Sequence, residues 1–204
     1  MRVISWDEYI GSREWGVGSS SQSLAITVGV FDGVHLGHQS LIRRICQPPS
    51  DSPLPTVITF RENPMKSLNP DLFAGDIYSL EHKLELLEAL GVKLTALIDF
   101  SEKISKINGR DFIDLLLGGQ SVTLLALGEN FRCGHGQDTG VGEIRALAMA
   151  HGTETWIAPP VMDGGKPVSS NRIRQALAAG RFEEAQRMLG RPLDSIPFNN
   201  IVPK

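Results

Sequence analysis

The stretch Gly29-Val30-Phe31-Asp32-Gly33-Val34-His35-Leu36-Gly37-His38 follows an apolar run that begins at Leu24. The run predicts a buried strand, and the residues after His38 follow helical spacing. A glycine-rich turn lets the backbone approach a phosphate, and the amides that open the helix point toward it. His35 and His38, three residues apart, converge on the same anion. The stretch predicts a phosphate site at the carboxyl end of a parallel strand.

Strand-like and helix-like segments alternate along the rest of the chain. Four more apolar runs predict strands at Thr56 to Phe60, Leu94 to Phe100, Ser121 to Leu127 and Glu154 to Ala158. Helical patterns lie between them at His38 to Cys46, Ser79 to Leu90, Gly109 to Leu117 and Val141 to His151. The alternation predicts an α/β fold of Rossmann type, with a five-stranded parallel sheet and helices on both faces.

The two ends of the chain do not follow this alternation of strands and helices. We expect residues 1–21 to form an N-terminal arm and linker, with the flexible stretch at Gly16 to Ser21. Short helices are expected at Ser170 to Ala179 and Phe182 to Leu189, joined at Gly180. One domain then spans residues 1–192, and residues 193–204 form an irregular tail.

The composition narrows the possible partners. The chain has 204 residues, of which 41% are hydrophobic, and a formal net charge of -3. That charge offers no positive field for a polyanion, so nucleic acid is not expected as a partner. No apolar run approaches the roughly 18 to 20 residues of a membrane span, and we expect no membrane partner and a cytoplasmic location. Cys46 and Cys133 are too few for a disulfide framework or a thiolate zinc site.

Other readings of the histidine pair and of a late motif remain open. His35 and His38 could bind a metal, although no third ligand lies near them in sequence, so the metal ligands are unknown. Ser170, Asn171 and Arg174 open a late helix, where they predict a second anion site for the far end of a polyphosphate. Equally, the serine and asparagine could simply cap that helix.

Two loops follow strands at the same expected crest of the sheet. One runs from Gly128 to Gly136, and the other from Thr59 to Pro64. Each is either a binding loop or a mobile connection. Taken without the two motifs above, neither loop indicates a function.

At these four places the chain resembles the FMN adenylyltransferase module of the bacterial bifunctional riboflavin kinase/FAD synthetase family. The family pattern Gly-x-Phe-Asp-Gly-Val-His-x-Gly-His is met at every fixed position from Gly29 to His38. The late pattern Ser-Ser-Thr-Arg-Ile-Arg corresponds to Ser169 to Arg174, with Asn171 in place of the threonine. A closing Leu-Gly-Arg-Pro is met by Leu189 to Pro192.

The resemblance implies the reaction of ATP with FMN to give FAD and pyrophosphate, with Mg²⁺. The catalytic residues it implies are His35, His38, Ser170 and Arg174. The residues it implies for binding of ATP and FMN are Gly29, Phe31, Asp32, Gly33, Gly37, Asn63, Pro64, Gly128, Asn130, Arg132 and Asn171. Asn130 is the expected polar contact of the flavin.

This chain departs from the family pattern on the expected flavin side. Asn63 lies in the segment where the family has Pro-His-Pro, and Cys133 replaces an aromatic residue that helps to wall the flavin. The alternatives are therefore a nucleotidyltransferase for another phosphorylated acceptor, or a non-catalytic flavin- or nucleotide-binding module. The family's kinase domain is not expected in this chain, so a separate riboflavin kinase would supply FMN.

Overall fold

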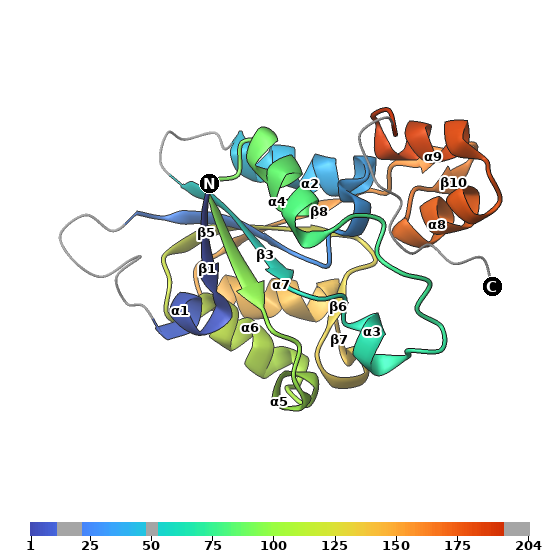
Figure 1. The fold of residues 1–204 in the computed structure, drawn as a ribbon. Helices are drawn as coiled ribbons and strands as arrows, with labels where there is room; N and C mark the ends of the chain where they lie inside the picture. The colour runs from blue at the N-terminus through green and yellow to red at the C-terminus, as the bar shows by residue number, and fades with distance from the viewer. Residues whose placement is uncertain (12–21, 48–52, 194–204) are drawn as a thin grey trace.

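The computed structural model describes residues 1–11, 22–47 and 53–193 (Figure 1). Its centre is a sheet of six parallel strands. Across the sheet the strands are β1 (Arg2–Ser5), β4 (Leu94–Ile98), β3 (Leu54–Phe60), β2 (Leu24–Val28), β5 (Val122–Gly128) and β8 (Glu154–Ala158). The predicted α/β class and parallel sheet are confirmed. The predicted strands and helices begin and end within two residues of the observed ones.

The prediction of five strands is wrong by one, because β1 adds an edge strand. Arg2 pairs opposite Leu94, and the pairing continues to Ser5. Helix α1 (Trp6–Gly11) follows, and Trp6 and Tyr9 are buried in the core. Residues 1–11 thus belong to the sheet and the core rather than to an arm. A four-residue strand has too little pattern to be recognised, and only its distant partner defines it.

Helices cover both faces of the sheet, as predicted. One face carries α2 (Leu36–Cys46) and α4 (Leu80–Ala89), and the other carries α1, α6 (Gly109–Leu117) and α7 (Val141–Ala150) (Figure 1). Ile42, Ile45 and Leu87 pack under the first pair. Phe112 and Ile144 belong to the larger cluster on the other face. The two layers bury β2 and β4 along their whole length, and each of these strands is apolar except for one threonine.

Residues 162–193 form a small unit beside the sheet (Figure 1). A hairpin of β9 (Met162–Asp163) and β10 (Lys166–Pro167) precedes α8 (Ser170–Ala178) and α9 (Phe182–Leu189). These helices share a hydrophobic core with Ile77 and Tyr78, which come from the segment before α4. The predicted linker at 16–21 and the predicted tail from 194 onward lie outside the described residues. The assignment of 1–192 to one domain stays a prediction.

Short elements gather after the carboxyl ends of the strands. They are η2 (Asp32–Val34) after β2, α3 (Met65–Leu68) after β3, α5 (Glu102–Ser105) after β4, and the β6 (Arg132–Cys133), η3 (His135–Gln137), β7 (Thr139–Gly140) loop after β5. Strand β2 has β3 on one side and β5 on the other, so the chain order reverses there. Open parallel sheets bind ligands beyond such a reversal. None of the described helices is long and apolar enough to cross a bilayer.

Candidate active site

The histidine loop, residues 29–38, leaves the carboxyl end of β2 in an unusual backbone conformation. Phe31 and Val34 have φ of 53° and 38°, in the left-handed region that side chains disfavour. Gly33 has φ of 77°, and a Cβ there would come within 2.9 Å of the Ile77 side chain. Each such residue costs about 1 to 3 kcal/mol and persists only where its surroundings enforce it. Strain of this kind is often found at ligand sites.

His35 and His38 form a stacked pair at the start of α2. Their ring centroids are 3.6 Å apart with an angle of 16° between the planes, and Phe31 packs edge-on against His38. His35 caps the helix, because its Nδ1 accepts a hydrogen bond from the His38 backbone N–H at 3.3 Å. An accepting Nδ1 leaves Nε2 of a neutral His35 to carry the proton. The ring can therefore donate a hydrogen bond while it caps the helix.

Burial keeps both rings uncharged at neutral pH. Desolvation lowers the pKa of His35 to about 4 and lowers the pKa of His38 well below its usual range. The positive charges of Lys83 and Arg191 add to the effect on His38. Nδ1 of His38 is buried and has no partner among the described residues. The pair thus offers neutral imidazole groups at the positive end of a helix.

The conformation of the histidine loop is enforced by residues far along the chain. The carboxylate of Asp32 pairs with Arg174 and accepts a hydrogen bond from the Ile77 backbone N–H. The Ser170 hydroxyl donates to the Asp32 carbonyl at 2.8 Å. Arg191 donates to the carbonyls of Gly33 and Val34. The late serine–arginine motif therefore meets the histidine loop, as the phosphate-site hypothesis requires.

A cleft of about 1040 Å³ opens over the crest of the sheet. It is lined by the loops that follow β2, β3, β4, β5 and β8 and by the start of α8. Phe60 and Phe100 meet edge-to-face on its wall, with centroids 5.9 Å apart, and Phe112 and Phe131 also line it. The cleft is large enough for two small molecules. Aromatic side chains line its walls, and His35 and His38 line its floor, at the start of α2.

The glycine loop, residues 128–140, forms another wall and is held mainly from within. Arg132 Nε donates to the Gln137 carbonyl at 2.7 Å. The Asp138 carboxylate accepts from the Gly109 N–H at 3.0 Å and from the Thr139 hydroxyl at 2.9 Å. Gly134 packs so closely here that a Cβ would lie 2.2 Å from the Gly109 nitrogen. The loop is thereby fixed to the start of α6.

Nine of the fifteen site residues predicted from the sequence line the cleft. They are Gly29, Phe31, His35, Gly37, His38, Pro64, Gly128, Asn130 and Arg132. The other six do not line it: Asp32, Gly33, Asn63, Ser170, Asn171 and Arg174. Asp32 and Gly33 lie within the histidine loop and are contacted from outside it: Arg174 pairs with the Asp32 carboxylate, Ser170 donates to the Asp32 carbonyl, and Arg191 donates to the Gly33 carbonyl. Asn63 Oδ1 accepts from the Met65 N–H at the start of α3, and Asn171 is exposed on α8.

Several cleft or supporting residues escaped the sequence reasoning. Ser169 lines the cleft and caps α8 by accepting from the Arg172 N–H at 3.3 Å. The run of two serines was a usable signal for it. Arg191 lies in the closing Leu-Gly-Arg-Pro motif, but the motif did not indicate its contacts, and those of Lys83 were equally unmarked, because both side chains bond carbonyls in distant loops. Cys133, which the family resemblance already placed at the flavin wall, lines the cleft as well, and burial raises the pKa of its thiol to about 12. It is therefore a neutral wall group and not a nucleophile.

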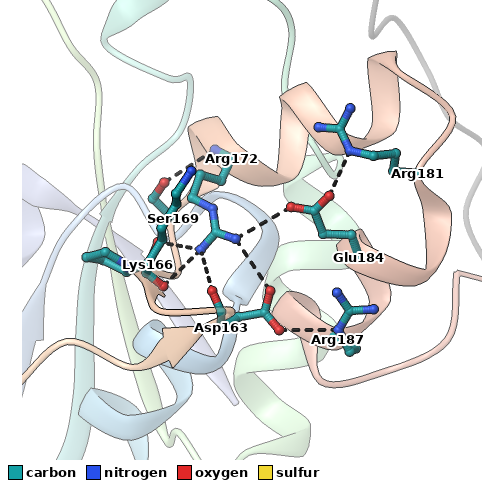
Figure 2. A network of polar contacts seen from close by, with 8 residues as sticks. Asp163, Lys166, Ser169, Arg172, Arg181, Glu184 and Arg187 are labelled. Atoms are coloured by element: carbon teal, nitrogen blue, oxygen red, sulfur yellow. Dashed lines mark hydrogen bonds and ion pairs between the residues drawn. The ribbon is translucent and has the colours of Figure 1, made fainter.

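A network around Arg172 holds the start of α8 against the hairpin (Figure 2). Its guanidinium donates to the carbonyls of Asp163, Lys166 and Pro167, and it pairs with the carboxylates of Asp163 and Glu184. With all these contacts made, Arg172 supports the fold and is not available to a ligand. The network places Ser169 at the edge of the cleft.

No resident metal site is visible in the part of the chain that the structure describes. There, no three His, Cys, Asp or Glu side chains cluster as metal ligands would. The reading of His35 and His38 as a metal pair therefore gains no third ligand.

Two solved structures share this architecture. A Streptococcus pneumoniae crystal structure described as a macrolide-efflux protein is 28% identical, with a TM-score of 0.80 over 95% of this chain and 63% of that chain. The pantoate-beta-alanine ligase of Francisella tularensis is 19% identical, with a TM-score of 0.59 over 92% of this chain and 79% of that chain. The second likeness concerns the fold alone.

Several curated proteins are similar to this chain in sequence. The bifunctional riboflavin kinase/FMN adenylyltransferase of Escherichia coli (strain K12) is 30% identical over 173 residues, which is 84% of this chain and 55% of the relative. An FAD synthetase of Listeria monocytogenes is 25% identical over 84% of this chain and 70% of that protein. The chain thus spans about half the length of the bifunctional relatives. The sequence model of FAD synthetase matches residues 18–172, and this chain belongs to the FAD synthetase family.

Proposed function

We propose that this chain transfers the adenylyl group of ATP to the phosphate of FMN, which yields FAD and pyrophosphate. The observation that carries the proposal is the neutral His35 and His38 pair on the floor of the cleft, at the start of α2. Membership of the FAD synthetase family agrees with this reaction.

The chemistry needs placement and charge stabilisation more than a strong base. A phosphate oxygen of FMN attacks the α-phosphorus of ATP, and the bond from that phosphorus to pyrophosphate breaks. The FMN phosphate is already ionised at neutral pH, so no proton has to be removed from it. The Nε2–H of His35 and the amides of α2 would donate to oxygens on which negative charge grows, and each such donor is worth about 3 to 4 kcal/mol.

We assign the two sides of the cleft to the two substrates. The ATP side comprises the histidine loop and the start of α8, where Asn171 and Ser169 lie beside Ser170. Ser170 and Arg174 would act on the pyrophosphate end mainly by fixing Asp32 and hence the histidine loop. The FMN side comprises the aromatic wall and the glycine loop.

On the FMN side, shape and apolar surface would select the acceptor. Phe60, Phe100 and Phe131 offer surfaces for a flat aromatic ring. Asn130 and Arg132 are among the polar residues of the glycine loop that line the cleft, as Gly128 and Pro64 also do. We propose that Asn130 hydrogen-bonds the flavin.

Mg²⁺ would arrive with ATP, as the ion bound to its phosphates. Magnesium usually keeps several waters and binds substrate phosphates through few protein carboxylates. Because the described residues provide no cluster of three ligands, the donor set does not fit a resident ion. No step of the proposed transfer is assigned to a protein-bound metal.

FMN must come from a reaction that phosphorylates riboflavin. We propose that a separate riboflavin kinase supplies it, and that this chain performs the adenylyl transfer alone in the cytoplasm, where ATP is abundant. Incubation with riboflavin and ATP should then give no FMN.

The decisive experiment is chromatography of the products after incubation with ATP, FMN and Mg²⁺. FAD and pyrophosphate should appear in equal amounts, and neither should form when CTP replaces ATP. A preference for another phosphorylated acceptor would favour the alternative raised by Cys133, which lines the cleft. Binding of ATP and FMN without turnover would identify a non-catalytic module and overturn the proposal.

A further inference from the structure

Lys83 is a buried cation beneath the crest of the sheet, next to the cleft and not on its surface. Its side chain comes from the first half of α4 and is 8% exposed. Burying an ammonium group without hydrogen-bond acceptors costs free energy, so a buried lysine is expected to donate hydrogen bonds. The described residues provide acceptors for it.

The ammonium of Lys83 reaches two loops at once. Nζ donates to the Phe60 carbonyl at 2.8 Å, and it lies 3.4 Å from the Val30 carbonyl and from the Thr59 hydroxyl. The Thr59 hydroxyl in turn donates to the Val30 carbonyl at 3.0 Å. Val30 opens the histidine loop after β2, and Phe60 ends β3 at the aromatic wall. One side chain therefore joins the two neighbouring strands where they leave the sheet.

This position lies between the two substrate sides of the cleft. Val30 and Phe60 both line the cleft, whereas Lys83 does not. The distance between the Val30 and Phe60 carbonyls fixes the position of the histidine loop relative to the aromatic wall. A misplacement of about 1 Å between reacting groups can lower a rate about 100-fold.

We propose that Lys83 is a positioning residue that holds the histidine loop and the aromatic wall in register for the transfer. The expected effect of Lys83 on turnover rests on the proposed function. The hydrogen bonds by which Lys83 joins the two loops, called the tether below, do not. The titratable groups that face Lys83 are Asp32 of η2, Asp76 of the segment before α4 and the neutral His38 of α2. Thr59, from β3, faces it with a hydroxyl that does not titrate.

The test of turnover compares Lys83→Met with Lys93→Met. Methionine keeps the length of the side chain and removes the charge and the donors. Lys93 is exposed, so its variant is a control for the same change of net charge. In Lys83→Met we expect kcat for FAD formation to fall about 10- to 100-fold, while KM for ATP and FMN stays within about threefold. A kcat within threefold of the wild type, or a loss equal to the fraction of unfolded protein, would overturn the proposal.

Hydrogen exchange tests the tether without reference to any reaction. The Gly29 N–H is bonded to the Ile58 carbonyl and the Arg61 N–H to the Ile98 carbonyl, so both report on the two strand ends. In Lys83→Met these amides should exchange about tenfold faster, while the amide of Ile26 is unchanged. Unchanged exchange at both strand ends overturns the tether. If the wild type forms no FAD, the proposed function fails, and hydrogen exchange alone then decides on Lys83.

The wild type supplies a second readout should Lys83→Met fail to fold. Desolvation lowers the pKa of Lys83 to about 8, against the pull of Asp32 and Asp76. As the pH rises, the Lys83 ammonium loses one N–H donor and its positive charge. The value of kcat should therefore fall severalfold between about pH 7.5 and 9.5. Lys83→Arg should move that decline to higher pH. A flat profile in the wild type overturns the proposal.

Discussion

The histidine loop and the glycine loop face the same cleft but are held in different ways. The histidine loop is largely buried, and side chains from residues 170, 174 and 191 fix it from outside. The glycine loop is mostly exposed and is fixed by its own backbone and by Asp138. The comparison indicates that the proposed reacting side is rigid, whereas the proposed acceptor side can adjust to what it binds.

The largest effect should come from Asp32→Ala. Asp32 is 5% exposed, and its removal leaves Arg174 as a buried charge without its carboxylate. Loss of one partner of such a pair costs about 3 to 5 kcal/mol. Urea denaturation should show this loss in the free energy of unfolding.

Arg187→Ala is the control for Asp32→Ala. Arg187 pairs with Asp163 but its side chain is 60% exposed, so its removal should cost less than about 1 kcal/mol. Similar losses in the two variants would show that the histidine loop does not depend on its distant contacts.

His38→Ala should be nearly as severe, but in turnover. Removal of the imidazole that we propose stabilises growing negative charge should lower kcat about 100- to 1000-fold and leave the affinity for FMN nearly unchanged. Steady-state kinetics and flavin binding measure the two quantities. His151→Ala, at an exposed histidine that contacts Asp114, should leave both unchanged. An equal loss of FMN binding in His38→Ala would place this residue on the acceptor side.

The pH dependence of stability should follow from the buried His35. Its pKa is about 4 in the folded chain and about 6.5 in the unfolded chain, so the unfolded state binds more protons between these values. The free energy of unfolding therefore falls as the pH drops through this window, by about 2 to 3 kcal/mol at pH 4.5 relative to pH 7. In urea titrations, His35→Gln should lack this part of the fall. The same pH dependence in both proteins would contradict the burial argument.

The smallest effect should come from the glycine loop. Asp138→Ala removes the acceptor of the Gly109 N–H and the Thr139 hydroxyl, which should cost about 1 kcal/mol of stability. KM for FMN should rise about 3- to 10-fold with kcat unchanged, because only the position of the wall is altered. Asp138→Asn keeps an acceptor oxygen and should behave as the wild type. A fall in kcat comparable to that of His38→Ala would erase the contrast between the two loops.

Periodic and motif-bearing parts of the chain could be predicted from the sequence. The strands at 24–28 and 122–128 are apolar except for one threonine in each and the glycine that closes the second, and the helix at 109–117 has one apolar face, so their patterns identify them. The histidine loop was recognised because turn, glycine and histidine signals coincide within ten residues. Such local signals need no knowledge of distant partners.

Features that depend on distant contacts could not be predicted. Strand β1 has four residues and exists through its pairing with β4. Arg174 was predicted to bind phosphate, but its guanidinium pairs with Asp32, 142 residues away. Lys83 lies on the same helix face as Leu80 and Leu87, but its hydrogen-bond partners, the carbonyls of Val30 and Phe60, belong to distant loops. A single sequence carries no sign of such pairings.

The contacts of Arg191 with Gly33 and Val34 bear on the order of events during protein synthesis. A ribosome releases residues 1–128, which supply five of the six sheet strands, well before it adds residue 191. The strained turn at 31–34 therefore cannot acquire all its supports until residue 191 has emerged. Nascent chains are expected to form most of the sheet before the histidine loop reaches its final conformation.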